Sequence, residues 1–175
     1  MAVAWADMST GDFAVQEVAV DRLEGVLAML APAELVVPTG ATLPEGVAGL
    51  GPCLTEQAPS LFDSAGGTRA LCSYYAVASL DGFGQFSRAM SAAAGALLGY
   101  IELTQKGNMP RLRPIQAITG SGYMEIDQAT RRSLEITRTL SGEVKGSLLA
   151  AIDLTVTSAG GRLLAARIGA PLASR

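Results

Sequence analysis

The chain has 175 residues, of which 49% are hydrophobic, and a formal net charge of −3. This length corresponds to one domain, or to one small domain plus part of another, and the apolar content is enough for a buried core. A free-standing DNA-binding protein usually has a basic surface, which this composition does not provide. The chain has no histidine, which excludes histidine general bases, Ser-His-Asp and Cys-His sites, and histidine metal ligands.

The two cysteines, Cys53 and Cys72, lack C-x-x-C spacing and indicate free thiols in a reducing compartment. The N-terminus lacks the charged-then-apolar layout of a signal peptide. The most apolar run, residues 92–101, is about half as long as a membrane span. We therefore expect a soluble, cytoplasmic protein that does not enter a membrane.

The first third of the chain predicts strands and one helix. Residues 2–20 read as a β-hairpin, with turn residues at positions 9–12. Asp21 is expected to begin a helix, because Glu24 follows at capping-box spacing. Apolar residues at i, i+3, i+4 and i+7 predict one buried face, formed by Leu23, Val26, Leu27 and Leu30. A short strand at residues 34–37 follows, and this strand–helix–strand order predicts a parallel crossover in one sheet.

The middle of the chain predicts two helices. Residues 39–59 are rich in glycine and proline and are expected to be the least ordered part. A helix is expected at residues 67–75, followed by a loop at 79–86 and by the longest helix at 88–105. The first helix should bury Ala70, Leu71 and either Tyr74 or Tyr75. The apolar stripe of the longest helix is Met90, Ala94, Leu97, Leu98 and Ile101.

The last third predicts a connector and then helices alone. Residues 106–114 contain two prolines, and residues 115–126 look extended but are broken by Gly120-Ser121-Gly122, where we expect a domain boundary. Asp127 should cap a helix that continues to about Ser141, and replacing it with alanine should cost about 1 kcal/mol. Arg131 and Glu135 would form an i,i+4 pair on that helix. Ser147 should cap residues 148–152, and a final helix is expected at residues 158–169.

Several segments resemble the MutS family of DNA mismatch-recognition proteins. Residues 127–135, DQATRRSLE, are similar to the family segment D-x-A-T-R-R-N-L-E, and Gly146-Ser147-Leu148-Leu149 with residues 153–157 resembles G-S-L-L-x-x-L-D-x-T-x-T. The match extends backward, in the right order, through residues 5–13, 31–35, 81–84 and 104–106. It implies a ribonuclease-H-like α/β connector with a mixed sheet at residues 1–106, a linker at 107–126, and the start of an all-α core or lever domain at 127–175. In the family one more strand precedes the hairpin, so the chain looks like an internal fragment.

The resemblance also implies a function. The family reads mismatches with a Phe-x-Glu motif and hydrolyses ATP with a Walker A loop, and neither motif occurs here. We therefore expect no catalytic, metal or cofactor-binding residue in this chain; ATP and Mg are implied for the full-length family only. The implied role is to transmit conformational change between those domains, within a homodimer that binds mismatched DNA, and to offer a docking face for MutL. Arg69, on the helix at 67–75, is the candidate docking residue.

The candidate lever residues lie in the second half of the resemblance. They are Asp127, Thr130, Arg131, Arg132, Glu135, Ser147, Asp153 and Arg162. The last helix departs from the family: Ala166, Arg167 and Ile168 stand where the family has an arginine, a tryptophan and a leucine. Gly161 and Gly169 each weaken that helix by about 1 kcal/mol relative to alanine.

An alternative function is a metal-dependent nuclease on a ribonuclease-H-like fold. Asp7, at the end of the first strand, is placed where such enzymes hold a metal carboxylate, but two-metal chemistry needs three or four converging carboxylates. We favour Asp7 as a turn residue that binds local N–H groups. A stand-alone protein-interaction module is a second alternative.

Other motifs are weaker. Lys145-Gly146-Ser147 has the reverse of the Walker A order, and Gly82-x-Gly84 and Gly120-x-Gly122 lack the third glycine of a dinucleotide fingerprint. The basic residues could contact DNA phosphates, but we favour a solvated surface with ion pairs to Glu125, Glu135 and Glu143, since no aromatic residues are interleaved. These basic residues are Arg111, Arg113, Arg131, Arg132, Arg138 and Lys145. Phe83 is expected to plug the space between two helices, and Cys72 to pack in the core.

Overall fold

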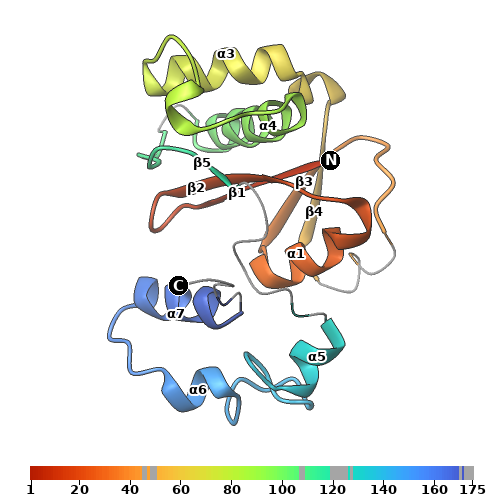
Figure 1. Ribbon diagram of the computed structural model, residues 1–175, viewed down its shortest axis with the longest axis vertical. Helices are drawn as coiled ribbons and strands as arrows, with labels where there is room; N and C mark the ends of the chain where they lie inside the picture. Colours follow the sequence, from red (N-terminus) through yellow and green to blue (C-terminus); the bar gives the residue numbers. More distant parts are fainter. Residues whose placement is uncertain are drawn as a thin grey trace. The chain divides into compact units, whose positions relative to one another are not determined.

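The computed structural model describes residues 1–44, 47, 51–106, 109–118, 126, 128–169 and 171. The chain divides into two compact units (Figure 1). The first unit consists of Met1–Arg22 and Ala33–Thr119, and the second of Leu23–Pro32 and Gly120–Arg175. The first unit contains all the strands among the described residues, and the second contains helices.

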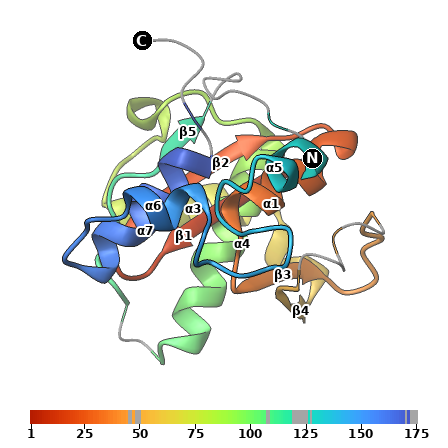
Figure 2. The same ribbon diagram turned by 90° about the horizontal axis from the view of Figure 1, so that it is seen from below.

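The first unit contains two small sheets. Strands β1 (Ala2–Asp7) and β2 (Asp12–Glu17) form the predicted antiparallel hairpin, and β5 (Gln116–Ile118) lies parallel to β2, which gives the order β1-β2-β5. Strand β3 (Glu34–Pro38) lies parallel to β4 (Cys53–Gln57) in a separate sheet, and Figure 2 shows this pair side by side.

Two predictions about these strands are wrong. The parallel crossover from β2 to β3 is absent, because the place beside β2 is taken by β5, a strand about a hundred residues further along the chain. The segment 39–59 also contains a regular strand, β4, which pairs with β3 along its whole length. The prediction failed because β4 is stabilised by this partner and not by a local pattern.

Helix α4 (Arg88–Thr104) covers one face of the hairpin sheet, and α3 (Ser64–Tyr75) packs on α4 (Figure 1). A 3₁₀ turn, η2 (Pro59–Phe62), leads to α3, and η3 (Asp81–Phe83) leads to α4. Helix α3 begins three residues before the predicted start, because the carboxylate of Asp63 accepts a hydrogen bond from the N–H of Gly66 at 2.6 Å. The hydroxyl of Ser87 caps α4 in the same way, by accepting from the N–H of Met90 at 3.2 Å.

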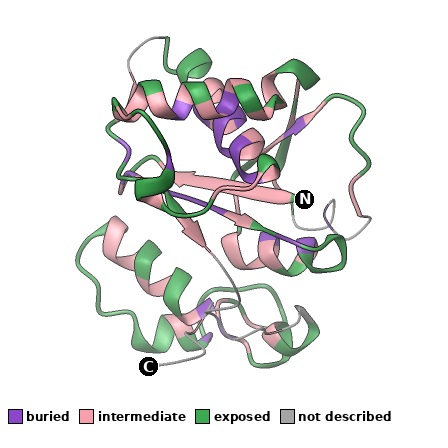
Figure 3. Cartoon of the chain, turned by 45° about the horizontal axis from the view of Figure 1, so that its top comes forward, coloured by how far each residue is buried: buried purple, intermediate pink, exposed green. Residues whose placement is uncertain are grey.

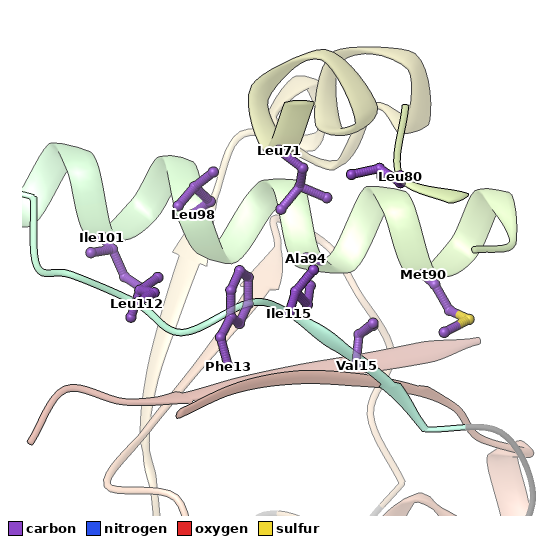
Figure 4. Packing of buried hydrophobic residues seen from close by; sticks show 10 residues of the cluster. All are labelled: Phe13, Val15, Leu71, Leu80, Met90, Ala94, Leu98, Ile101, Leu112 and Ile115. Carbon is purple, nitrogen blue, oxygen red and sulfur yellow. The ribbon is translucent and has the colours of Figure 1, made fainter. Parts of the chain in front are cut away.

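The core of the first unit lies between α4 and the hairpin sheet (Figure 4). Phe13 and Val15 of β2 meet the buried face of α4, and Leu71 enters from α3. The predicted stripe of α4 is confirmed, although Leu97 is only partly buried. Full burial of a Phe, Val or Leu side chain contributes about 1.5–3 kcal/mol of hydrophobic free energy. Phe83 and Cys72 are partly buried and pack against this core, as predicted for Cys72.

The second unit is helical. Its helices are α1 (Leu23–Leu30), α5 (Gln128–Ser133), α6 (Leu148–Ile152) and α7 (Ser158–Gly169). Helix α7 has the predicted bounds and packs beside α1 and α6. The α-helix predicted from Asp21 starts later, since Val20–Arg22 forms a 3₁₀ turn, η1. Leu23 and Leu27 are buried as predicted, whereas Val26 and Leu30 are half-buried.

The predicted long helix from Asp127 to about Ser141 is wrong in length. Helix α5 ends at Ser133, and Glu135 has a positive φ of 48°, which no α-helix can continue through. The cap expected at Asp127, and the glycines expected to break the linker, lie outside the described residues.

The second unit has few buried side chains (Figure 3). Large apolar side chains are exposed on and between its short helices. They include Leu134, Leu140, Val144, Leu148, Ile152, Leu154, Val156 and Leu163. Within the described part of the chain, no helix combines the length and the apolar character that a membrane span requires.

Candidate functional site

Arg131 joins the two ends of the predicted lever segment. It lies on α5, and its Nη1 donates a hydrogen bond to the carbonyl oxygen of Gly169, the last residue of α7. The carbonyls at a helix C-terminus carry partial negative charge, so a cation there is favourable. Nη2 donates more weakly to the carbonyl oxygen of Ile126 at 3.5 Å. Burial lowers the pKa of Arg131, and its Nε is buried without a hydrogen-bond partner in the described structure.

The predicted pairing of Arg131 with Glu135 is absent. Because the backbone turns at Glu135, that side chain does not lie one helical turn above Arg131. Its Oε1 accepts instead from the N–H of Leu140 at 2.7 Å, and its carbonyl oxygen accepts from the N–H of Leu148 at 3.0 Å. Glu135 therefore ties the turn after α5 to the start of α6.

Ser147 caps α6 as predicted. Its hydroxyl accepts from the N–H of Ala150 at 3.2 Å and donates to the carbonyl oxygen of Val144 at 2.7 Å. Ser147 has no exposed surface, and these two bonds satisfy its hydroxyl as donor and as acceptor inside the unit. It is one of two buried polar residues among those described.

The remaining lever candidates are exposed. The carboxylate of Asp153 accepts from the N–H and the hydroxyl of Thr155, at 2.9 and 2.6 Å, and these bonds lower the pKa of Asp153. Thr130 and Arg132 present exposed side chains on α5, and Arg162 is exposed on α7. Arg131 and Glu135 thus make the contacts that connect α5 to α7 and to α6, and Ser147 caps α6. Four other candidates lie at the surface, and Asp127 lies outside the described residues.

Arg69 is exposed on α3, as the docking prediction requires. It lies on the opposite side of the helix from Leu71 and Gly67, which are buried against the rest of the first unit. Docking of a partner at this face stays a prediction.

Asp7 is a turn residue, as we favoured. Its Oδ1 accepts from the N–H and the hydroxyl of Ser9, at 2.7 and 2.5 Å, and from the N–H of Thr10 at 3.3 Å. No group of three or more His, Cys, Asp or Glu side chains that could hold a metal occurs among the described residues. The geometry therefore offers the nuclease alternative no support.

The basic residues find different partners from those expected. Arg113 forms an ion pair with Asp12 at 2.7 Å, and Arg138 donates to the carbonyl oxygen of Gly142 at 2.9 Å. Glu125, one of the expected acidic partners, lies outside the described residues. Arg111 and Arg113 belong to the first unit, and the other four to the second.

Sequence reasoning missed the hydroxyl groups of Tyr74 and Tyr75. Their aromatic rings marked them only as candidates for burial, yet both hydroxyls bind main-chain atoms 36 to 38 residues away. No local pattern could have indicated these bonds. The cap at Asp63 could have been found, because Asp precedes Ser-Ala at the start of a helical stretch.

Comparison with known proteins gives matches along almost the whole chain. A family model described as MutS domain II matches residues 1–113, and one described as MutS domain III matches residues 129–175. Relatives named DNA mismatch repair protein MutS include those of Paracoccus denitrificans, 54% identical over 170 residues, and Ruegeria pomeroyi, 49% identical over 177 residues. Each alignment covers 97% of this chain but 19% and 20% of the respective relative, so the chain spans about a fifth of their length.

Proposed function

Because the chain belongs to the MutS family of DNA mismatch repair proteins, we propose that it acts as the mechanical middle of a mismatch-recognition ATPase. In this role it transmits conformational change between a mismatch-reading domain and an ATPase domain. The observation that carries the proposal is the pair of family matches, to domain II and then domain III, in that order along the chain.

The architecture supports this proposal. The chain forms a mixed α/β unit and a helical unit, and packed helices shift as units when they carry a conformational change. We assign the ribonuclease-H-like connector to residues 1–106, the linker to 107–126 and the start of the core domain to 127–175. Arg131 and Glu135 are the residues best placed to carry motion through the second unit, since they tie α5 to α7 and to α6.

The longer protein would supply the chemistry. ATP and Mg would bind to a domain outside this chain, mismatched DNA would be read by another, and the protein would act as a cytoplasmic homodimer. This chain would contribute contacts and not catalysis.

A chimera tests the proposal. The segment of Paracoccus denitrificans MutS that aligns with this chain would be replaced by residues 1–175 and expressed in a strain that lacks its own MutS. Spontaneous mutation frequency should fall to within about twofold of the strain with its native protein. A chimera that accumulates and folds but leaves the frequency at the level of the deletion strain would refute the proposed function.

The docking part of the proposal concerns Arg69 and MutL. In the chimera, Arg69→Glu should weaken capture of Paracoccus denitrificans MutL, because a cation on the outer face of α3 becomes an anion. Arg88→Glu is the matched control, since Arg88 is also an exposed arginine of the first unit but lies at the start of α4. Equal capture of MutL by the Arg69 variant and the unsubstituted chimera would remove Arg69 from the docking face.

A further inference from the structure

Residues 110–115 form a segment outside the helices and strands, called here the strap, that is bound through its main chain. The hydroxyl of Tyr74 donates to the carbonyl oxygen of Pro110 at 2.7 Å and accepts from the N–H of Leu112 at 2.8 Å. The hydroxyl of Tyr75 donates to the carbonyl oxygen of Arg113 at 2.7 Å. Two adjacent residues at the end of α3 therefore hold three main-chain groups of the strap.

The hairpin turn holds the strap from another element. The N–H of Arg113 donates to the carbonyl oxygen of Gly11 at 2.7 Å. Gly11 approaches the strap so closely that a methyl group in its place would lie 2.8 Å from the carbonyl oxygen of Arg111. Leu112 and Ile115 are 5% and 2% exposed and pack in the core (Figure 4). The strap is thus part of the first unit, although its sequence predicted a connector.

The two phenol rings are fixed by packing. The rings of Tyr74 and Tyr75 meet edge to face, with centroids 4.9 Å apart, and the centroid of the Phe83 ring lies 4.9 Å from that of Tyr75. Burial raises the pKa of Tyr75 to about 12, so its hydroxyl keeps its proton at physiological pH. The packed rings therefore hold both hydroxyls at the strap, and that of Tyr75 is a neutral donor.

We propose that Tyr74 and Tyr75 form a latch that fixes the strap to the end of α3. The latch thereby also fixes the start of the chain that leads to the second unit. Tyr74 and Tyr75 are positioning residues. One consequence rests on the proposed function. In a mismatch repair protein, a partner that binds α3 would change the position of the strap through this latch, and so the start of the chain that leads to the core domain.

Hydrogen exchange of the 175-residue chain tests the latch itself. In the double variant Tyr74→Phe/Tyr75→Phe, both rings remain but all three latch bonds are lost. The exchange rates of the N–H groups of Leu112 and Arg113 should rise by about three- to tenfold, because these groups also keep bonds to Pro110 and Gly11. Exchange in the buried part of α4 should stay within about twofold, which separates a local release from general destabilisation.

Tyr100→Phe is the matched control. Its hydroxyl donates to Glu34 Oε1 at 2.5 Å, elsewhere in the first unit, so its removal should leave exchange in the strap unchanged. Unchanged exchange at Leu112 and Arg113 in the double variant would overturn the latch. A rise of the same size throughout α4 would also overturn it, since the hydroxyls would then be serving general stability.

The chimera tests the consequence. With protein level and melting temperature matched to the Tyr100→Phe chimera, the latch variant should raise mutation frequency at least severalfold. A latch variant that repairs as well as the unsubstituted chimera would refute transmission through the strap. If the unsubstituted chimera itself fails, the proposed function fails, and the exchange experiment still decides whether the latch exists.

Discussion

Gly95 of α4 faces Gly67 of α3 at the point where the two helices cross, and a methyl group on Gly95 would lie only 2.2 Å from the Cα of Gly67. A methyl group on Gly67 would lie 2.2 Å from the carbonyl oxygen of Ser91. Two glycines thus let the backbones of α3 and α4 touch, and this contact seats Leu71 in the core beneath them.

Gly95→Ala should therefore destabilise the first unit. Overpacking lowers the free energy of unfolding by about 1–3 kcal/mol, and the better helix propensity of alanine raises it by about 1 kcal/mol. We expect a net loss of up to about 2 kcal/mol, measured by urea unfolding followed by circular dichroism. Gly25→Ala is the control, since nothing lies within 4 Å of its added methyl group on α1. That substitution should stabilise by about 0.5–1 kcal/mol, and a similar gain at Gly95 would contradict the close contact.

Asp63→Ala should shorten α3. The carboxylate of Asp63 satisfies the free N–H of Gly66 in the first turn, and loss of such a cap costs about 1 kcal/mol. Asp81→Ala is a useful comparison, because its carboxylate accepts from the hydroxyl of Ser79 but caps no α-helix. Thermal melting should show a lower midpoint for Asp63→Ala alone; equal midpoints would mean that the cap contributes nothing.

Arg131→Ala should loosen the second unit. It removes the hydrogen bond to the carbonyl of Gly169 and the positive charge beside the end of α7. Because bonds to charged donors contribute about 1.5–3 kcal/mol and Arg131 is only half-buried, we expect a loss of about 1–2 kcal/mol. The neighbouring Arg132→Ala, at an exposed position, should change stability by less than about 0.5 kcal/mol. Hydrogen exchange in the last turn of α7 is the measurement, and equal exchange in the two variants would exclude the contact.

Tyr75 should make the first unit sensitive to alkali. Burial raises its pKa to about 12 in the folded chain, above the value of about 10 for an exposed tyrosine. A raised pKa means that its contribution to stability is complete below about pH 10 and is lost as the pH rises toward about 12. The fall of the free energy of unfolding over this interval should be shallower in Tyr75→Phe than in the parent chain. An identical slope in both would show that Tyr75 titrates as if exposed.

Short-range patterns in the sequence determined much of this protein. The hairpin, α4 with its apolar stripe, α7, the turn at Asp7 and the cap at Ser147 each follow from residues within about one or two helical turns or one tight turn. The motifs around residues 127–135 and 146–157 were also sufficient to indicate the MutS family, since they preserve residue identity and order.

The tertiary structure decided what depends on distant partners. Strand β4 exists beside β3, and β5 reaches β2 across about a hundred residues, so neither pairing could be read from local periodicity. Helix α5 stops early because the backbone turns at Glu135, whose carboxylate and carbonyl then bind Leu140 and Leu148. The hydroxyls of Tyr74 and Tyr75 turn an expected connector into a bound strap. The strand pairs and the strap are stabilised by groups far apart in the sequence, and the turn at Glu135 by groups beyond its own helix, so only folding brings these partners within hydrogen-bonding distance.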